Sequence, residues 1–400
     1  MRKIDLTNFR VARSETARDI NRRIMLNLVR KHQPISRADL ARRSGLQRST
    51  ISAITEQLLA ENWLKEGAIA QSARGRKPRF LHLNVERAGI IGINVRPSST
   101  NMALADLGGR FLAQQSIPTP ADPDEFVAVV TERVRGLIAA HPSMSYEGIG
   151  VSLPGRVDDS SQRFVFAPNL GWREENLKPR LELATGLPVE LENEANACAL
   201  AEFWFGHQTE GVRNLVAVAV SEGIGTGIIL NGQLVRGPSG LAGEFGHIAL
   251  GEGGPECSCG NRGCWEVYAS NWAALRYYAG EAKPRNGHAR GGAIMTFDGL
   301  MSLAEQGDVR AVSALEHMAR YLGMGLAMIV TGLAPEVIVI VGEVTRAWER
   351  LGPLVADEVK KHSFTHATTR IITSGPAAFP RLRGIIALVL QKRFGAPSVA

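Results

Sequence analysis

Residues 241–266 hold three of the four cysteines of the 400-residue chain. Together with His247, the cysteines Cys257, Cys259 and Cys264 follow the spacing H-x9-C-x-C-x4-C. Three thiolates and one imidazole are a donor set that holds structural zinc in a tetrahedron. The glycines between them allow the tight turns that ligands so close in sequence need. A closed structural zinc site is therefore predicted in preference to a disulfide or free-thiol loop, because a cytosolic chain keeps its thiols reduced.

Two carboxylates, Glu244 and Glu266, flank the cysteine cluster. An ionised carboxylate offers several hydrogen-bond acceptor sites and no donor, which suits the recognition of hydroxyl groups. Two such groups beside a metal-bound loop predict a ligand that carries several hydroxyls.

The positive charge of the chain is concentrated at its N-terminal end. Residues 1–85 carry 18 lysines and arginines against 7 acidic residues, which leaves 28 against 32 for residues 86–400. A basic module joined to a mildly acidic body indicates a polyanion as the partner of the module, most simply nucleic acid. The alternative is a basic face that only meets solvent.

Length and hydropathy limit the class of protein further. A chain of 400 residues exceeds one ordinary hydrophobic core, so two or three domains are expected. No apolar run is as long as a membrane span, and the opening MRKIDLTNFRVARSE lacks the apolar segment of a signal peptide. We therefore expect a cytoplasmic protein without a membrane partner.

The basic module has the pattern of a helix-turn-helix. A first helix is predicted over residues 17–30, where apolar residues recur every four positions. A second helix begins at the S-x-x-D signal of Ser36 and ends at Gly45, and a third helix follows at once. Polar residues at the start of the third helix, largely off its apolar stripe, are the candidates for contacts with base edges: Gln47, Arg48, Ser49, Thr50 and Ser52.

A wing is predicted after these helices. Residues 63–68 and 79–83 can pair as strands around a loop that carries Arg74, Arg76 and Lys77. Guanidinium groups on such a loop can enter a narrow minor groove or hold phosphates, while the recognition helix occupies the major groove. The alternative is a small helical interaction domain with a basic hairpin.

The rest of the chain alternates glycine-rich apolar strands with helical stretches, which is typical of an α/β body. Asn193 and Glu194 come between a predicted strand and a predicted helix, where α/β sheets place their ligands. Capping of the helix by Asn193 explains the same pattern equally well. The turn at residues 222–227 is either a phosphate cradle or a tight hairpin, because strand residues continue directly after it.

A winged helix-turn-helix followed by E-x-G-H and then C-x-C-G-x-x-G-C-x-E resembles the ROK family of sugar-responsive repressors and sugar kinases. The resemblance covers nearly the whole chain. It implies an actin-like, sugar-kinase-type fold of two α/β lobes around a cleft, assembled into dimers or tetramers. The pattern of the family implies that the sugar is held by Asn169, Asn193, Glu194, Glu244, His247 and Glu266. In this arrangement His247 gives one ring nitrogen to zinc and the other to a hydroxyl.

These features together predict the domain organisation. We expect a winged helix-turn-helix DNA-binding domain over residues 1–85. The N-terminal lobe of the body is expected over residues 86–205, with a closing helix near residues 380–395. The C-terminal lobe, which carries the zinc loop, is expected over residues 206–379.

The chain departs from the family's kinases where those enzymes bind nucleotide. The kinases carry D-x-G-G-T on the first strand turn, and the aligned residues here are Asn94-Val95-Arg96-Pro97-Ser98. Proline has no amide hydrogen, and Arg96 brings a bulky side chain to a place that needs bare backbone. The catalytic base of the kinases is the aspartate of an N-D-A-N motif, and Glu194 stands at this position. Its extra methylene would move the base by about an ångström, which can lower the reaction rate on the order of a hundredfold. The kinases also have a Gly-Gly pair in the adenosine pocket, late in the sequence, and the corresponding residues here are Gly342 and Glu343.

The nucleotide-binding motifs of the kinases are altered here, whereas the predicted sugar ligands are all present. This combination predicts a receptor that binds a sugar without catalysing phosphoryl transfer. We expect a DNA-binding transcriptional regulator, a repressor released by a monosaccharide or a derivative. A symmetric dimer would place two recognition helices about 34 Å apart on a palindromic operator. The alternative is an ATP-dependent sugar kinase with a DNA-binding appendage. A third hypothesis is a constitutive DNA-binding protein whose body serves only for oligomerisation.

Overall fold

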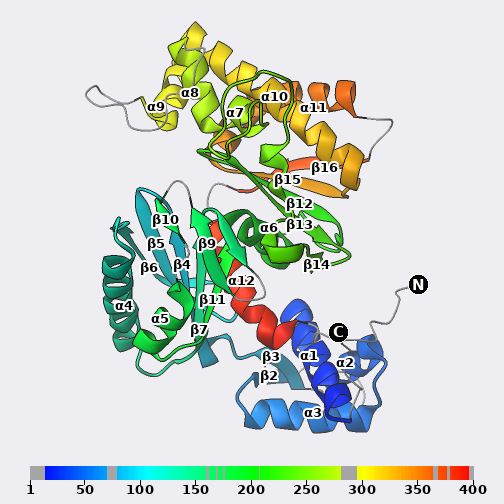
Figure 1. Ribbon diagram of the computed structural model, residues 1–400. Coiled ribbons are helices and arrows are strands. Elements are labelled where there is room, and N and C mark those ends of the chain that lie inside the picture. The colour runs from blue at the N-terminus through cyan, green and yellow to red at the C-terminus, as the bar shows by residue number, and fades with distance from the viewer. Residues whose placement is uncertain are drawn as a thin grey trace.

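The computed structural model describes residues 14–69, 79–158, 162–167, 170–173, 176–206, 208–280, 295–363, 368–375 and 379–395. Figure 1 shows a small N-terminal domain below two α/β lobes, which lie one above the other. The last helix, α12 (Pro380–Phe394), runs from the junction of the lobes down to the N-terminal domain.

The N-terminal domain contains the predicted helix-turn-helix. Its elements are α1 (Ser14–His32), β1 (Ile35–Ser36), α2 (Arg37–Ser44), α3 (Arg48–Ala60), β2 (Leu64–Ile69) and β3 (Arg79–Leu83). The Ser36 hydroxyl accepts a hydrogen bond from the Asp39 backbone N–H at 3.1 Å, and Gly45 ends α2 with φ of 72°. The strands are antiparallel in the order β1-β3-β2, which gives the hairpin expected for a wing.

The N-terminal lobe is built on a mixed sheet of order β11-β7-β4-β5-β6. The strands are β4 (Ala88–Val95), β5 (Ser99–Asp106), β6 (Phe111–Pro118), β7 (Ser145–Leu153) and β11 (Val189–Asn193), and the 3-10 turn η1 (Val85–Arg87) precedes them. Ile91 and Ile93 face α4 (Pro123–Ala140) and α5 (Leu177–Thr185) in one core. Ile90 faces α12 on the other side. A small antiparallel sheet lies beside this lobe: β8 (Arg156–Asp158), β9 (Arg163–Ala167) and β10 (Trp172–Arg173).

The C-terminal lobe has a second sheet of order β14-β13-β12-β15-β16. Its elements are β12 (Leu215–Val220), β13 (Ile224–Leu230), β14 (Gln233–Leu234), η2 (Pro238–Gly240), η3 (Glu244–His247), α7 (Glu266–Ala269), α8 (Asn271–Ala279), α9 (Phe297–Glu305), α10 (Val309–Leu333), β15 (Val337–Val341), η4 (Glu343–Ala347), α11 (Trp348–His362) and β16 (Arg370–Thr373). Strands β12 and β13 pair antiparallel through Val220 and Ile224, so the glycine-rich turn is a hairpin. Alternate residues of β12 face α10 and α6 (Glu194–Phe205).

Helices α6 and α12 pack against each other between the two lobes. Helix α12 lies on β4 and β7 of the N-terminal lobe, and α6 lies on β12 and β13 of the C-terminal lobe. At the crossing of the two helices, a Cβ atom on Gly384 would lie 1.6 Å from the backbone oxygen of Ala197, so this position needs glycine. Cys198 is fully buried in the core that these helices share, and burial raises its thiol pKa to about 12.

Candidate metal and effector site

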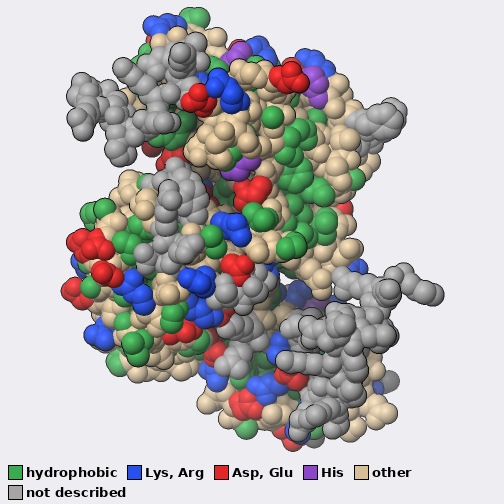
Figure 2. All heavy atoms as spheres, viewed as in Figure 1, with side chains coloured by type: hydrophobic (Ala, Val, Ile, Leu, Met, Phe, Trp, Pro, Cys, Tyr) green, Lys and Arg blue, Asp and Glu red, His purple; other side chains and the backbone are tan. Residues whose placement is uncertain are grey.

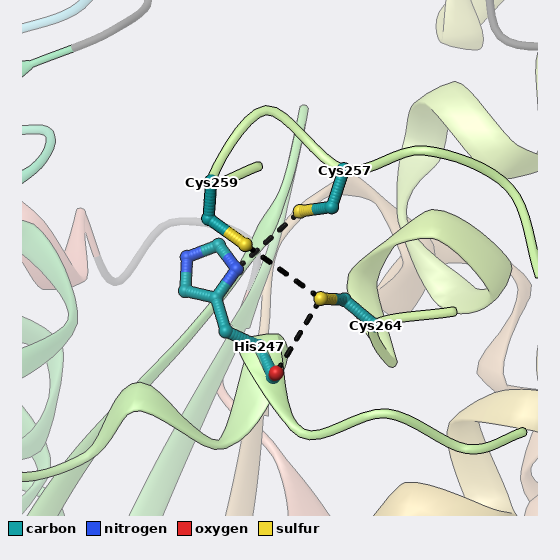
Figure 3. Close-up of side chains that lie close together, drawn as sticks. All are labelled: His247, Cys257, Cys259 and Cys264. Carbon is teal, nitrogen blue, oxygen red and sulfur yellow. Dashed lines mark hydrogen bonds between the residues drawn. The ribbon is translucent and has the colours of Figure 1, made fainter. Parts of the chain in front are cut away.

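The four predicted metal ligands converge in the structure. Figure 3 shows the three sulfur atoms and the ring of His247 directed toward one another. Their donor atoms all lie within 4.8 Å of one another. Cys257 Sγ is 3.5 Å from His247 Nδ1, and Cys259 Sγ is 3.7 Å from Cys264 Sγ. Metal–sulfur bonds of about 2.3 Å in a tetrahedron separate sulfurs by roughly 3.8 Å, so this cluster can hold a metal ion.

The backbone around the cysteines turns sharply. Gly260 has φ of 92°, a left-handed conformation that favours glycine, and its N–H donates to the Cys257 carbonyl at 3.0 Å. Isolated β-bridges join Ala249 to Cys264 and Glu256 to Arg262. This compact fold brings ligands from both ends of the loop to one point.

Burial affects the thiols of the cluster. It raises the pKa of Cys257, to which the carboxylate of Glu266 adds, and it raises the pKa of Cys264 to about 11. Without a cation these thiols are protonated at neutral pH, whereas a bound metal removes the protons because the thiolate is the ligand.

His247 connects the cysteine cluster to the two flanking carboxylates. Its Nδ1 faces Cys257 and lies 3.6 Å from Glu266 Oε1, whereas its Nε2 lies 3.7 Å from Glu244 Oε2. Burial raises the pKa of Glu244 above its ordinary value. One ring nitrogen is therefore directed to the thiols and the other to a carboxylate that is half exposed.

The hairpin of β12 and β13 links these carboxylates to the start of α6. Glu266 Oε2 accepts a hydrogen bond from the Ile224 backbone N–H at 3.4 Å. The hydroxyl of Thr226, two residues further on, donates to the carbonyl of Gly243 beside Glu244. Strand β13 also packs against α6. The loop that carries the cysteine cluster and the N-terminal end of α6 therefore both lie next to this strand.

Asn193 and Glu194 have different roles at the start of α6. Asn193 caps the helix, because its Oδ1 accepts from the Ala195 N–H at 2.7 Å, and its Nδ2 donates to the Gly155 carbonyl at 2.6 Å. Glu194 Oε2 accepts from Arg381 Nε of α12 at 2.6 Å. The Arg381 side chain is 11% exposed and that of Glu194 is 20% exposed, so this ion pair is largely shielded from water. Asn169, the remaining predicted sugar ligand, lies outside the described residues.

Arg96 joins the two lobes. Its Nη2 lies 3.3 Å from Glu222 Oε1 and its Nη1 lies 3.5 Å from Glu343 Oε1. Glu343 also accepts from Asn271 Nδ2 at 3.2 Å. A cavity of about 590 Å³ opens next to these groups, between β4 to β6, the start of α12 and the C-terminal lobe. Figure 2 shows acidic, basic and histidine side chains gathered on the surface where the lobes meet.

The predicted DNA-contacting residues lie at the first turn of α3. Gln47, Arg48 and Ser49 are exposed, and Thr50 and Ser52 are partly buried. The apolar stripe of the helix is buried against the domain core: Ile51, Ile54 and Leu58. The first turn is thus free to enter a groove. The predicted wing residues fall outside the described residues: Arg74, Arg76 and Lys77.

Sequence reasoning missed two residues of the site, Arg381 and Glu222. Arg381 follows Pro380 at the start of the last helix, and its partner Glu194 is far away in sequence. No local pattern indicates such a partner.

None of the described helices combines the length and the apolar character that crossing a bilayer requires.

Comparison with known proteins identifies the family. The model of the ROK family matches residues 90–392, and that of a winged helix-turn-helix DNA-binding domain matches residues 18–65. The chain belongs to the ROK family. Its body has the α/β fold of the sugar kinases in this family, and the N-terminal domain is of the DNA-binding type.

Two transcriptional regulators are similar to the chain over most of its length. It is 34% identical over 333 residues to the xylose repressor of Bacillus subtilis (strain 168), with 82% of this chain and 84% of the repressor aligned. It is 28% identical over 353 residues to the DNA-binding transcriptional dual regulator NagC of Escherichia coli (strain K12), with 85% and 84% aligned.

Solved structures of a regulator and of a kinase are similar to the chain as well. The crystal structure of a ROK family transcriptional regulator, described as a homolog of the E. coli MLC protein, aligns with a TM-score of 0.80 and 28% identity over 95% of this chain and 98% of that one. A ROK family glucokinase from Streptomyces griseus, in complex with glucose and AMPPNP, aligns with a TM-score of 0.63 and 31% identity over 75% of this chain and 99% of that one. The regulator therefore covers nearly the whole chain, whereas the kinase covers three quarters of it.

Proposed function

We propose that this protein is a sugar-responsive DNA-binding transcriptional regulator, a repressor of carbohydrate-metabolism genes that a monosaccharide or a derivative releases from its operator. The observation that carries this proposal is the combination of a helix-turn-helix with a sugar-type site in which Glu194 is paired with Arg381. The likeness to the xylose repressor and to NagC over more than four fifths of the chain supports it.

In this proposal a structural zinc ion is held by His247, Cys257, Cys259 and Cys264. Zinc would fix the loop on which Glu244 and Glu266 present their acceptor oxygens to hydroxyl groups. The sugar would be held by Asn169, Asn193, Glu194, Glu244, His247 and Glu266. Asn193 keeps a second amide hydrogen for a ligand while it caps α6.

The absence of phosphoryl transfer is the second part of the proposal. Arg96 stands where the kinases of the family use bare backbone for phosphate, and its guanidinium pairs with Glu222 and Glu343. A base must accept a proton from the substrate hydroxyl, but Oε2 of the Glu194 carboxylate already accepts a hydrogen bond from the guanidinium of Arg381.

DNA binding is assigned to the first turn of α3 and to the wing. We place the domain boundaries after residues 85 and 205, with α12 completing the N-terminal lobe and α6, the last helix before the second boundary, packed on the sheet of the C-terminal lobe. A homodimer or homotetramer would set two α3 helices on the halves of a palindromic operator.

An ATP-dependent sugar kinase is the second candidate, because the glucokinase of Streptomyces griseus aligns with three quarters of the chain and a cavity of about 590 Å³ lies between the lobes. Titration calorimetry with D-xylose, D-glucose and their phosphate esters tests the receptor. At least one of them should bind, and a coupled ADP assay with the same sugars should show no turnover above that of Glu194→Ala. Sugar-dependent turnover that Glu194→Ala removes would establish the kinase instead.

A further inference from the structure

We propose that Arg381 is the positioning residue through which an occupied sugar site acts on the DNA-binding domain. It ties Glu194 to α12, and the packed pair of α6 and α12 transmits the change to α1. This inference rests on the proposed function, because it concerns how the same site controls DNA binding.

The pair of α6 and α12 is the connection between the two lobes. Each helix lies on the sheet of a different lobe, as described above, and Ile385 and Leu388 of α12 share a core with Cys198 and Leu200 of α6. The helices touch backbone to backbone at Gly384 and Ala197. A change in the angle between the lobes therefore changes the angle at which α6 crosses α12.

The sugar end of the pair is the ion pair between Glu194 and Arg381. Both residues lie one helical turn from the crossing point, three residues before Ala197 and Gly384 respectively. Arg381 Nη2 is buried and has no hydrogen-bond partner among the described residues. The guanidinium is therefore only partly satisfied, so a hydroxyl that approaches Glu194 changes the balance of contacts at the start of both helices.

The other end of the pair contacts the DNA-binding domain at two points. Trp204 near the end of α6 lies under the guanidinium of Arg30 in α1, with 4.6 Å between Arg30 Cζ and the ring centroid. Phe394 at the end of α12 meets the ring of Trp63 edge to face at 6.1 Å. Arg23 Nη1 of α1 also donates to the carbonyl of Gly395 at 2.9 Å.

Helix α1 is thus held by the ends of two helices whose beginnings meet at the sugar site. From Glu194 to Trp204 α6 extends about 15 Å, and from Arg381 to Phe394 α12 extends about 20 Å. Rotation at the crossing moves Trp204 relative to Phe394, and both contact the domain that carries α3. One hydrophobic cluster includes α1, α3 and α12, so α1 does not move independently of the recognition helix.

Amide hydrogen exchange tests this connection without any sugar or DNA. Glu194→Gln removes the charge that Arg381 binds, and it should raise exchange about threefold or more both in residues 381–390 and in residues 20–32 of α1. The matched control is Asp298→Asn, which removes the carboxylate of an ion pair with Arg346 outside the helix pair and should leave α1 unchanged. Arg381→Lys provides a second variant if Glu194→Gln does not fold. Unchanged exchange in α1 in the folded variant would overturn the proposal.

A second experiment separates failure of this connection from failure of the proposed function. Arg30→Ala removes the contact of α1 with Trp204 without altering the sugar site, and Lys31→Ala, which breaks an exposed ion pair with Glu210, is the control. With D-xylose and D-glucose as probes, Arg30→Ala should bind sugar as the wild type does, but sugar should change its operator affinity less than about twofold. A full change in Arg30→Ala would contradict the connection, whereas a wild type that binds sugar without any change would contradict the regulator itself.

Discussion

The side chains of Arg96 and Glu343 meet across the junction of the lobes, with 3.5 Å between Nη1 and Oε1. Glu222 completes this ion pair, because its Oε1 lies 3.3 Å from Nη2 of the same arginine. Because all three side chains are partly exposed, such pairs contribute only about 0–1 kcal/mol each. They favour one arrangement of the lobes without locking it, which suits a receptor that must change its shape.

The proposed metal ligands allow a direct test at the same scale. Cys259→Ser should abolish stoichiometric zinc binding, because a serine hydroxyl is a much weaker zinc ligand than a thiolate. Elemental analysis of the purified protein measures the metal content. Cys198→Ala is the matched control: it removes the cysteine of α6, which is buried away from the cluster, and should keep one zinc per chain. Full zinc content in Cys259→Ser would count against the proposed ligand set.

Two elements of the N-terminal domain are joined by the ion pair of Arg22 in α1 and Glu61 after α3. The Arg22 guanidinium holds the pKa of Glu61 at about 2, below its usual value of 4.5. A carboxylate with a depressed folded-state pKa stabilises the fold above its unfolded pKa, and this stabilisation is lost as the pH falls from about 4.5 to about 2.

Glu61→Gln should therefore destabilise the domain at pH 7 by about 0.5 kcal/mol, a small value because the glutamate is more than one third exposed. Near pH 2 the difference from the wild type should vanish. Urea unfolding followed by fluorescence measures both. An effect of equal size at pH 7 and pH 2 would show that the charge of Glu61 is not its cause.

The crossing of α6 and α12 makes a stronger prediction. Gly384→Ala places a Cβ atom 1.6 Å from the Ala197 backbone oxygen, so the helices must separate, at a cost of about 1–3 kcal/mol or more. Gly136→Ala in α4 is the matched control, because nothing lies within 4 Å of its added methyl and alanine favours a helix by roughly 0.5–1 kcal/mol. The midpoints of urea unfolding should move in opposite directions. A Gly384→Ala midpoint equal to that of the wild type would contradict the close contact.

Elements with local signals could be predicted from sequence, and elements that depend on tertiary contacts could not. The cap of α2 by Ser36 and its end at Gly45 were correct, because both are short-range backbone effects. Strands β12 and β15 are continuous apolar runs, a pattern that indicates buried strands. Edge strands β6 and β16 are partly exposed and have no such run. Helix α1 is longer than predicted, and its last turn carries Arg30, Lys31 and His32, which favour a helix C-terminus.

The candidate site divides in the same way. The spacing of the cysteines predicted that His247 and the three cysteines meet at one point, because residues close in sequence can converge locally. The ion pairs of Arg381 with Glu194 and of Arg96 with Glu343 join segments that lie far apart in sequence, and no periodicity or motif encodes them. The capping role of Asn193 could be resolved only by the geometry of α6.

For the whole molecule, DNA binding should divide between two kinds of contact. Arg48→Ala should weaken binding to the preferred sequence by about 1–3 kcal/mol and reduce sequence preference, because Arg48 is exposed at the first turn of α3. Arg76→Ala, if the wing holds phosphate, should weaken all sequences alike and reduce the slope of log affinity against log salt by about 0.9. Anisotropy titrations at several salt concentrations distinguish the two outcomes. The same loss of sequence preference in both variants would place Arg76 in a base-reading role.

Sugar occupancy is expected to change the affinity of this protein for its operator DNA. The most direct measurement is the affinity of the full chain for a duplex selected by the protein from random sequences, with and without the sugar that binds it by calorimetry. Saturating sugar should change this affinity by about 5- to 150-fold, which corresponds to a coupling free energy of roughly 1–3 kcal/mol. An operator affinity that stays the same at saturating sugar would contradict it.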